Sequence, residues 1–345
     1  MSLYKNWMFR WEKRLTLRDA NRSVFPFDWG VEWLGNGASP PAPENPLARF
    51  KEFARDSLAN SHDFYSPPEA GNFTLKDDLL SFSSPTPTPY PKNNTAYGRL
   101  FPARDRTRAV ILVPQWNSDE NSHVGLCRIF QKMGINAVRL TLPYHEQRLP
   151  PGMKRADFMV SPNIGRTIHA TRQAILELRQ IVHWLRREGY ERIGVMGTSL
   201  GSCVAYLAFI HDRNISTGVF NHVSAFFADA VWTGLSTRYV RSGLEGNISL
   251  EDLRRCWAPI SPWYFIEQLE NDDRPHLLIN AKYDLTFLPE LTQLVFDRYA
   301  EKKIRLDRAV LPCGHYTTAR FPFNYLDGWH ICRYLQRRLR LGEHG

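Results

Sequence analysis

The chain has 345 residues, of which 43% are hydrophobic and 23% are charged. This length and composition supply a sizeable core, which excludes a mainly disordered protein, and no uninterrupted apolar stretch approaches the ~18 residues that suggest a membrane span. The net charge of +9 is spread along the chain and predicts a solvated basic surface; nucleic-acid binding is disfavoured because no aromatic and basic recognition motif accompanies the charge.

Cysteine usage and the amino-terminal residues bear on the compartment. The chain has five cysteines, which is an odd number, and they are far apart and form no CxxC pair: Cys127, Cys203, Cys256, Cys313 and Cys332. This pattern is typical of free thiols in a reducing compartment, and the first residues lack the apolar segment of a signal peptide. We therefore expect a cytoplasmic protein. The sequence leaves its oligomeric state open.

Residues 3–17 predict an amphipathic helix, because apolar and aromatic residues recur at helical spacing with basic residues between them. Packing of this helix on its own domain is the favoured interpretation, and contact with an anionic membrane is the alternative. Two proline-rich stretches, at 37–46 and 83–92, are expected to be extended connections. We therefore predict that residues 1–94 form an N-terminal extension and residues 95–345 form the main domain.

From Tyr97 onward, strand and helix patterns alternate. Apolar β-rich runs at 108–114 and 135–143 flank a helical pattern at 123–134, which together predict a βαβ unit. A long helical pattern that ends at Gly189 is followed by a buried strand at 192–197 and by an apolar helix. Three further strands are expected within residues 216–229, 274–284 and 304–315. Repeated alternation of this kind predicts an α/β fold with a mostly parallel sheet flanked by helices.

The stretch Gly197-Thr198-Ser199-Leu200-Gly201 joins the buried strand to the apolar helix. A GxSxG pattern alone is weak evidence, but a strand–turn–helix context is the setting of a nucleophile elbow. Glycines two residues either side of Ser199 would allow the tight turn that lifts the hydroxyl above the sheet. Such a turn would also leave the Leu200 backbone N–H facing a reacting carbonyl.

With this motif in place, residues 95–340 resemble the α/β-hydrolase superfamily. The segment "LPYHEQR" at 142–148 is similar to segments of dienelactone-hydrolase-like esterases, and "VHWLRREGY" at 182–190 together with the elbow resembles a branch of abhydrolase-domain proteins. The resemblance implies an acid and a histidine after later strands, and Asp284 and His315 occupy those places. His315 would then act as the base for Ser199, and Asp284 would orient the imidazole. Asp229, at the end of the preceding predicted strand, is the alternative acid. A purely structural interpretation of the three residues would require three coincidences in the family's order.

The loop after residues 108–114 departs from the family pattern, because "PQWNSDEN" contains no glycine. The second oxyanion donor is expected to be the backbone N–H of Gln115. Trp116, His145 and Arg148 are candidates for substrate contacts at the ends of the strands. For Arg148 a structural ion pair is the favoured alternative.

An insertion at about 230–274 is rich in aromatic residues, and in this superfamily such a segment often caps the site. The sequence therefore predicts a serine hydrolase that cleaves a carboxylic ester. A peptidase or thioesterase with the same residues, and a catalytically silent binding protein, are the alternatives. No zinc-spaced ligands and no phosphate-binding loop occur in the sequence, so neither a metal nor a cofactor is expected, and the expected partner is a small-molecule ester or acyl substrate.

Overall fold

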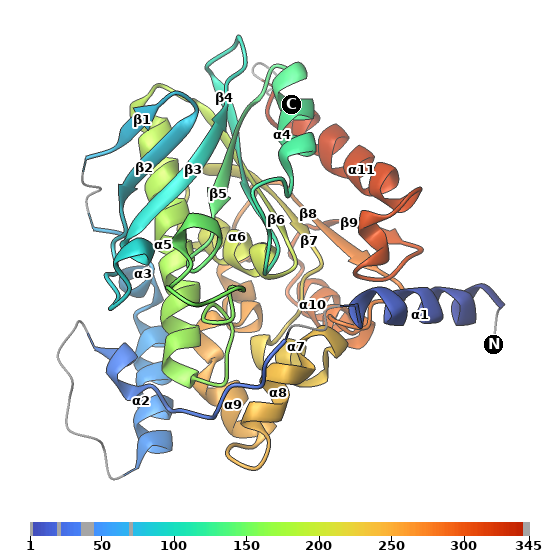
Figure 1. Ribbon diagram of the computed structural model, residues 1–345. Helices are drawn as coiled ribbons and strands as arrows, with labels where there is room; N and C mark the ends of the chain where they lie inside the picture. Colours follow the sequence, from blue (N-terminus) through green and yellow to red (C-terminus); the bar gives the residue numbers. More distant parts are fainter. Residues whose placement is uncertain (1–2, 19–21, 36–44, 69–71, 341–345) are drawn as a thin grey trace.

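The computed structural model describes residues 3–18, 22–35, 45–68 and 72–340 (Figure 1). The described residues form a 9-stranded sheet with the order β1-β2-β3-β5-β4-β6-β7-β8-β9. β1 to β3 pair in antiparallel fashion and β3 pairs antiparallel to β5, whereas the remaining pairs are parallel. The strands are β1 (Thr74–Lys76), β2 (Leu79–Ser83), β3 (Thr95–Phe101), β4 (Arg108–Val113), β5 (Asn136–Thr141), β6 (Arg192–Thr198), β7 (Ile215–Asn221), β8 (His276–Ala281) and β9 (Asp307–Leu311).

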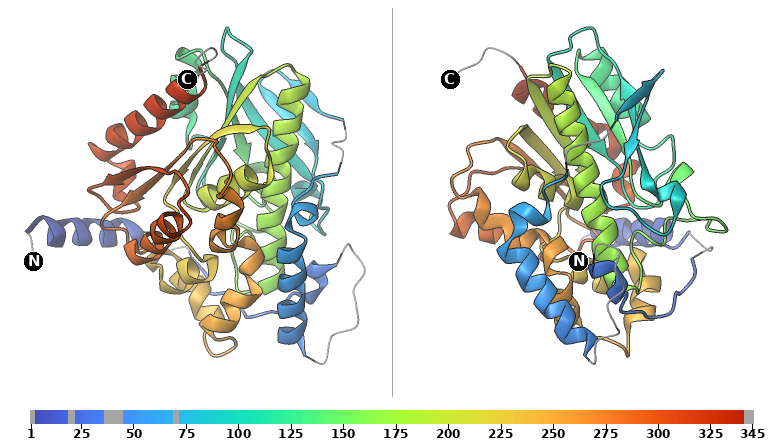
Figure 2. Two further views of the ribbon diagram at one scale, coloured as in Figure 1. Left: turned by 180° about the vertical axis from the view of Figure 1, so that it is seen from behind. Right: turned by 90° about the vertical axis from the view of Figure 1, so that its left-hand side faces the viewer.

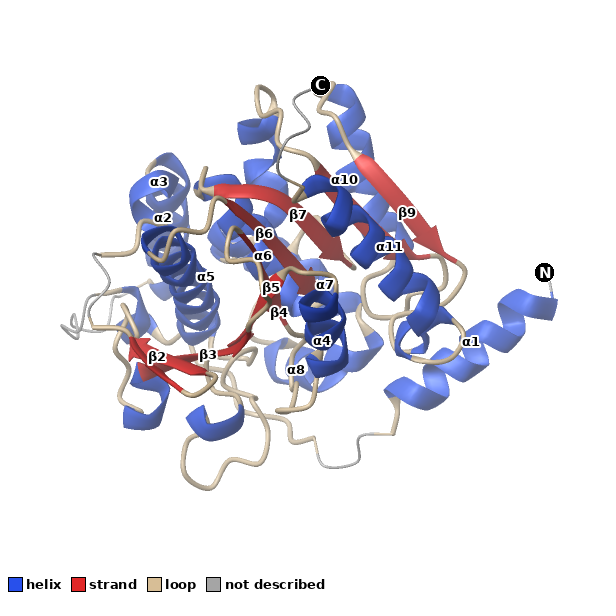
Figure 3. Ribbon diagram, turned by 90° about the horizontal axis from the view of Figure 1, so that it is seen from above, coloured by secondary structure: helices blue, strands red, loops and turns tan. Residues whose placement is uncertain are grey.

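Helices lie on both sides of this sheet (Figures 2 and 3). The long helix α5 and the elbow helix α6 pack together on one face, and α4 and α11 cover the other face. The α-helices are α1 (Leu3–Thr16), α2 (Pro46–Ala59), α3 (Ser61–Phe64), α4 (Val124–Lys132), α5 (Ile164–Arg187), α6 (Leu200–His211), α7 (Phe227–Thr233), α8 (Arg238–Leu244), α9 (Leu250–Cys256), α10 (Pro289–Glu301) and α11 (Phe323–Arg338).

The alternation of side chains along the central strands builds a core on each face of the sheet. On β4, Ile111 and Val113 join the core beneath α5 and α6, whereas Val110 and Leu112 join the core beneath α4 and α11. Successive side chains of a strand point to opposite faces, so continuous apolar strands such as β4 and β6 must be covered on both sides. The predicted fold class is confirmed.

One predicted boundary is wrong. The strand expected at 216–229 ends at Asn221, and Asp229 lies in α7. The apolar run "SAFFAD" continues past the strand because it forms a buried helix entry, and periodicity cannot separate a short buried strand from such a helix. β1 and β2, which precede residue 95, extend the main sheet. The proline-rich stretch 83–92 connects β2 to β3, and most of the stretch 37–46 lies outside the described residues.

Two further findings concern the chain as a whole. Among the described residues, no helix combines the length and the apolar character needed to cross a bilayer. All five cysteines are free, and four of them are buried.

Candidate active site

Ser199 lies in the sharp turn between β6 and α6. Its φ of 56° and ψ of −121° are unusual for a residue with a side chain and store strain of roughly 1–3 kcal/mol. A Cβ at Gly197 would collide with the backbone of Gly201, and a Cβ at Gly201 would collide with the carbonyl oxygen of Val113. The Ser199 N–H donates to the Asn221 carbonyl oxygen over 2.8 Å, which ties the turn to β7. Close backbone approach therefore requires glycine at both flanking positions.

His315 and Asp284 come to Ser199 from the loops after β9 and β8. The Ser199 hydroxyl lies 2.9 Å from His315 Nε2, and His315 Nδ1 lies 2.8 Å from Asp284 Oδ2. Asp284 Oδ1 accepts the backbone N–H groups of Thr286 and Phe287 over 2.7 and 2.8 Å. The carboxylate is thus held in place by its own loop, and the three predicted residues form one hydrogen-bonded chain.

The electrostatics of this chain favour an ionised carboxylate and a basic imidazole. Burial alone would raise the pKa of Asp284, but the charge of His315 and hydrogen bonds from both neighbouring histidines hold the pKa well below its usual range. Burial alone would lower the pKa of His315, but the charge and hydrogen bond of Asp284 outweigh it, and the pKa lies above its usual value. The pair therefore strengthens His315 as a proton acceptor.

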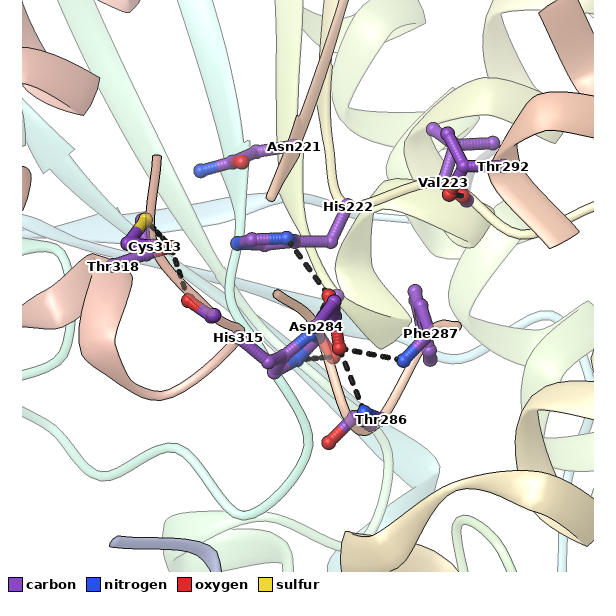
Figure 4. Close-up of polar contacts among 12 residues, drawn as sticks. Asn221, His222, Val223, Asp284, Thr286, Phe287, Thr292, Cys313, His315 and Thr318 are labelled. Atoms are coloured by element: carbon purple, nitrogen blue, oxygen red, sulfur yellow. Dashed lines mark hydrogen bonds and ion pairs between the residues drawn. The ribbon is translucent and has the colours of Figure 1, made fainter. Parts of the chain in front are cut away.

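His222, which the sequence analysis does not identify, is the second imidazole at Asp284. Its Nδ1 lies 3.3 Å from Asp284 Oδ2, and its ring lies 4.4 Å from the ring of His315 (Figure 4). His222 directly follows β7, has a φ of 62° and is buried. Burial, followed by the nearby charge of His315, lowers its pKa, so it remains neutral and can donate its Nδ1–H to the carboxylate.

Glu12, from the N-terminal helix α1, supports the loop that carries His315. Its carboxylate accepts the backbone N–H groups of Tyr316 and Thr317 over 2.7 and 2.9 Å, and a Cβ at Gly314 would collide with it. Glu12 is fully buried although it is a charged residue. Buried carboxylates need such partners, and these bonds tie α1 to the loop that carries His315.

The glycine-free loop after β4 is held by side chains. Asn117 takes a φ of 58°, a conformation that Asn tolerates better than most residues, and its N–H donates to His145 Nε2 over 2.9 Å. The Trp116 indole N–H donates to the Ala156 carbonyl oxygen over 2.8 Å. Gln115 lines the cavity in front of Ser199, and the Leu200 N–H, as the first of α6, has no acceptor within its helix. Both expected oxyanion donors therefore lie in segments that border Ser199.

Two cavities meet at Ser199. The first is a pocket of about 540 Å³ with mostly apolar walls, formed in part by α7 and the segment 235–237 of the insertion. The second is a wider, more polar groove of about 1980 Å³ between α1, α4 and α11, which also reaches His315. Trp116 borders both cavities. The lining of the apolar pocket includes Val160, Leu200, Phe227, Val231, Pro262 and Phe287.

Two of the predicted substrate contacts and the alternative acid lie in other roles. Arg148 is fully buried and forms two hydrogen bonds of 2.7 and 2.6 Å with Glu177. It therefore belongs to a structural ion pair, which was the favoured alternative for this residue. His145 is buried behind the β4 loop, where it accepts from Asn117. Asp229 forms an ion pair with Arg254, whereas His315 contacts Asp284. Asp229 is therefore not the acid that orients His315 in this structure.

His222, Asp284 and His315 also form a group that could hold a metal ion, because their ligand atoms lie within 4.8 Å of one another. A metal there would replace the bond between His315 and Asp284, which already has the geometry of a hydrogen bond. We therefore interpret the group as one that handles protons.

The comparison with sequences gives a local match. Residues 119–243 match the family described as Alpha/beta hydrolase domain containing 18. Two curated relatives, both uncharacterized proteins of Mycobacterium tuberculosis, are 30% identical over 93 residues, which cover 27% of this chain. The chain spans about a fifth of the length of these relatives, because the match covers 22% of them.

Solved structures resemble a large part of the chain. The Pyrococcus horikoshii acylaminoacyl peptidase has a TM-score of 0.57 at 14% identity and covers 73% of this chain and 41% of its own. A puromycin-hydrolyzing peptidase of Mycobacterium tuberculosis has a TM-score of 0.56 at 13% identity, over 73% of this chain and 38% of its own. A Pyrococcus furiosus esterase has a TM-score of 0.50 at 17% identity, and the match covers 81% of this chain and 95% of the esterase. At these identities the likeness concerns the fold, and together with the sheet order it shows that the described residues have the α/β-hydrolase fold.

Proposed function

We propose that the protein is a serine hydrolase that cleaves a carboxylic ester through an acyl-enzyme on Ser199. The observation that carries this proposal is the hydrogen-bonded chain from Ser199 through His315 to Asp284, with distances of 2.9 and 2.8 Å. Nucleophile, base and orienting carboxylate follow one another in the geometry that activates a serine hydroxyl.

In the acylation step, Ser199 Oγ attacks the ester carbonyl carbon while its proton moves to His315 Nε2. The carbonyl π electrons move to the oxygen, and the oxyanion is stabilised by the N–H groups of Leu200 and Gln115. Asp284 stabilises the imidazolium that forms. When the tetrahedral intermediate collapses, the bond to the leaving oxygen breaks, and His315 Nε2 returns the proton to that oxygen, so an alcohol departs.

In the deacylation step, a water molecule takes the place of the alcohol. His315 removes a proton from it, the resulting hydroxide attacks the acyl carbon, and the proton then passes to Ser199 Oγ as the acyl bond breaks. A carboxylic acid leaves and the free serine is restored.

The two cavities suggest how an ester would lie. The apolar pocket suits an apolar acyl group, because burial of apolar surface is the main favourable term for such a ligand. The groove on the other side of Ser199 would then receive the alcohol portion, and it is also the path by which water reaches His315.

Hydrolysis of p-nitrophenyl esters of increasing acyl length tests this proposal, with the matching p-nitroanilides and acyl thioesters beside them. We expect turnover of esters with the wild-type protein and loss of activity in Ser199→Ala, with Ser202→Ala as the neighbouring control serine. Full activity of Ser199→Ala would overturn the mechanism. Preferential cleavage of the anilides or thioesters would instead favour a peptidase or a thioesterase.

A further inference from the structure

The solvent face of α11 carries an exposed aromatic stripe. Phe321, just before the helix, and Tyr325 and Trp329 within it are 76%, 72% and 51% exposed. Tyr325 and Trp329 are four residues apart and therefore lie on one side of the helix, and the Phe321 ring lies 6.0 Å from the Tyr325 ring. Two further turns of the same side carry the exposed Arg333 and Arg337, and the Arg333 guanidinium lies 5.0 Å from the Trp329 ring centroid. Three large rings exposed side by side form a patch that a solvated surface does not need.

The helix α1 also exposes apolar side chains. Leu3 is 88% exposed and Trp7 is 47% exposed. Ring contacts lead from Trp7 to Trp11 over 5.1 Å and from Trp11 to Phe323, at the start of α11, over 6.2 Å. The two helices lie on the same side of the molecule, next to the edge strand β9 (Figures 1 and 2).

The fully exposed charges of these two helices have one sign. In α1 the acidic residue is Glu12, which is fully buried against the His315 loop. In α11 it is Asp327, which accepts a hydrogen bond from Asn221 over 2.9 Å and whose pKa burial raises to about 7. The charged side chains that these helices expose are the basic ones, namely Arg10, Lys13, Arg14, Arg333 and Arg337.

We propose that this docking face, formed by Leu3, Trp7, Phe321, Tyr325, Trp329 and the exposed basic residues of both helices, binds the surface of a lipid bilayer with anionic headgroups. Aromatic rings settle at the boundary between headgroups and acyl chains, while arginine and lysine are attracted by the negative surface. The groove that reaches Ser199 is lined by Leu15 and Arg18 at the end of α1 and by Asn324 and Gly328 of α11. Docking would therefore bring the mouth of the groove close to the bilayer. Binding itself does not depend on whether Ser199 is a nucleophile.

Co-sedimentation of the full chain with vesicles tests the proposal. We expect binding to vesicles of phosphatidylcholine and phosphatidylglycerol to be about tenfold stronger than binding to phosphatidylcholine alone, and to weaken as salt is raised. The double variant Tyr325→Ser/Trp329→Ser should bind about tenfold more weakly. The matched control Leu75→Ser/Leu79→Ser, which removes two exposed leucines at the opposite edge of the sheet, should bind like the wild type.

A second variant, Arg333→Glu/Arg337→Glu, keeps the rings and should lose the preference for anionic vesicles. Circular dichroism of each variant shows whether the fold is retained. Wild-type protein that stays in the supernatant with both kinds of vesicle, or that binds both equally, would overturn the proposal. Dimers in light scattering that the Tyr325→Ser/Trp329→Ser variant dissociates would also overturn it, because the face would then be an interface between two copies of the chain.

Discussion

Replacing Glu12 by alanine should show that the N-terminal helix belongs to the active site. The substitution leaves the N–H groups of Tyr316 and Thr317 without their acceptor, at a cost of about 1–3 kcal/mol each. Burial raises the pKa of Glu12, so the ionised carboxylate carries a cost of its own, which its removal relieves. We therefore expect a loss in the lower half of the summed cost of the two N–H groups, about 3 kcal/mol in the free energy of unfolding. At about 2 °C for each kcal/mol, Tm should fall by about 6 °C.

The effect on activity should exceed the effect on stability. His315 lies one residue before Tyr316, and displacement of a catalytic group by about 1 Å costs up to about a hundredfold in rate. Thermal unfolding and ester hydrolysis well below Tm are the assays, and Lys13→Ala, on the exposed face of the same helix, is the control. A Glu12→Ala variant with wild-type kcat would refute the reasoning, even if its Tm were lower.

Three further predictions concern groups around Ser199. The neutral imidazole of His315 is the base, and Asp284 raises its pKa, so kcat/KM should rise with pH with a midpoint above 6.5. Asp284→Asn should lower both this midpoint and the rate. A wild-type midpoint at or below 6.5 would contradict the prediction. His222→Asn, which tolerates the positive φ, should lower kcat about tenfold by removing the imidazole that lies 3.3 Å from the Asp284 carboxylate, and it should move the midpoint to higher pH. An unchanged pH profile would leave His222 with a packing role. Gly201→Ala should prevent folding or lower Tm strongly in thermal unfolding, because its Cβ meets the Val113 carbonyl oxygen, whereas Gly125→Ala in α4, where a Cβ meets nothing, should be tolerated.

The sequence predicts the parts of the site that local order determines. Ser199 is recognisable because a buried strand, a glycine-flanked turn and an apolar helix follow one another directly, and a turn of this kind has few other uses. Asp284 and His315 follow the next strands, and the carboxyl ends of parallel strands meet at one edge of the sheet. The structure brings these three side chains into one chain of hydrogen bonds.

The remaining residues of the site are held there by contacts between residues far apart in the chain. Glu12 lies more than three hundred residues before its partners, so no local pattern separates it from an exposed helix residue. The sequence gives only a weak indication of His222, namely that it directly follows a strand of the sheet. The predicted strand runs past His222, because a buried helix begins soon after the true strand end. Arg148 ends up within the core because Glu177, on α5, neutralises it, and a single sequence does not reveal that pairing.

The most direct test of the central claim is covalent labelling of the purified chain with a fluorophosphonate probe, with the modified residue located by mass spectrometry. We expect labelling at Ser199 that is lost in His315→Ala and strongly reduced in Asp284→Ala, while both variants keep their circular dichroism spectra. Absence of labelling in well-folded wild-type protein, or equal labelling of Ser199 in His315→Ala, would contradict the claim that His315 activates this serine.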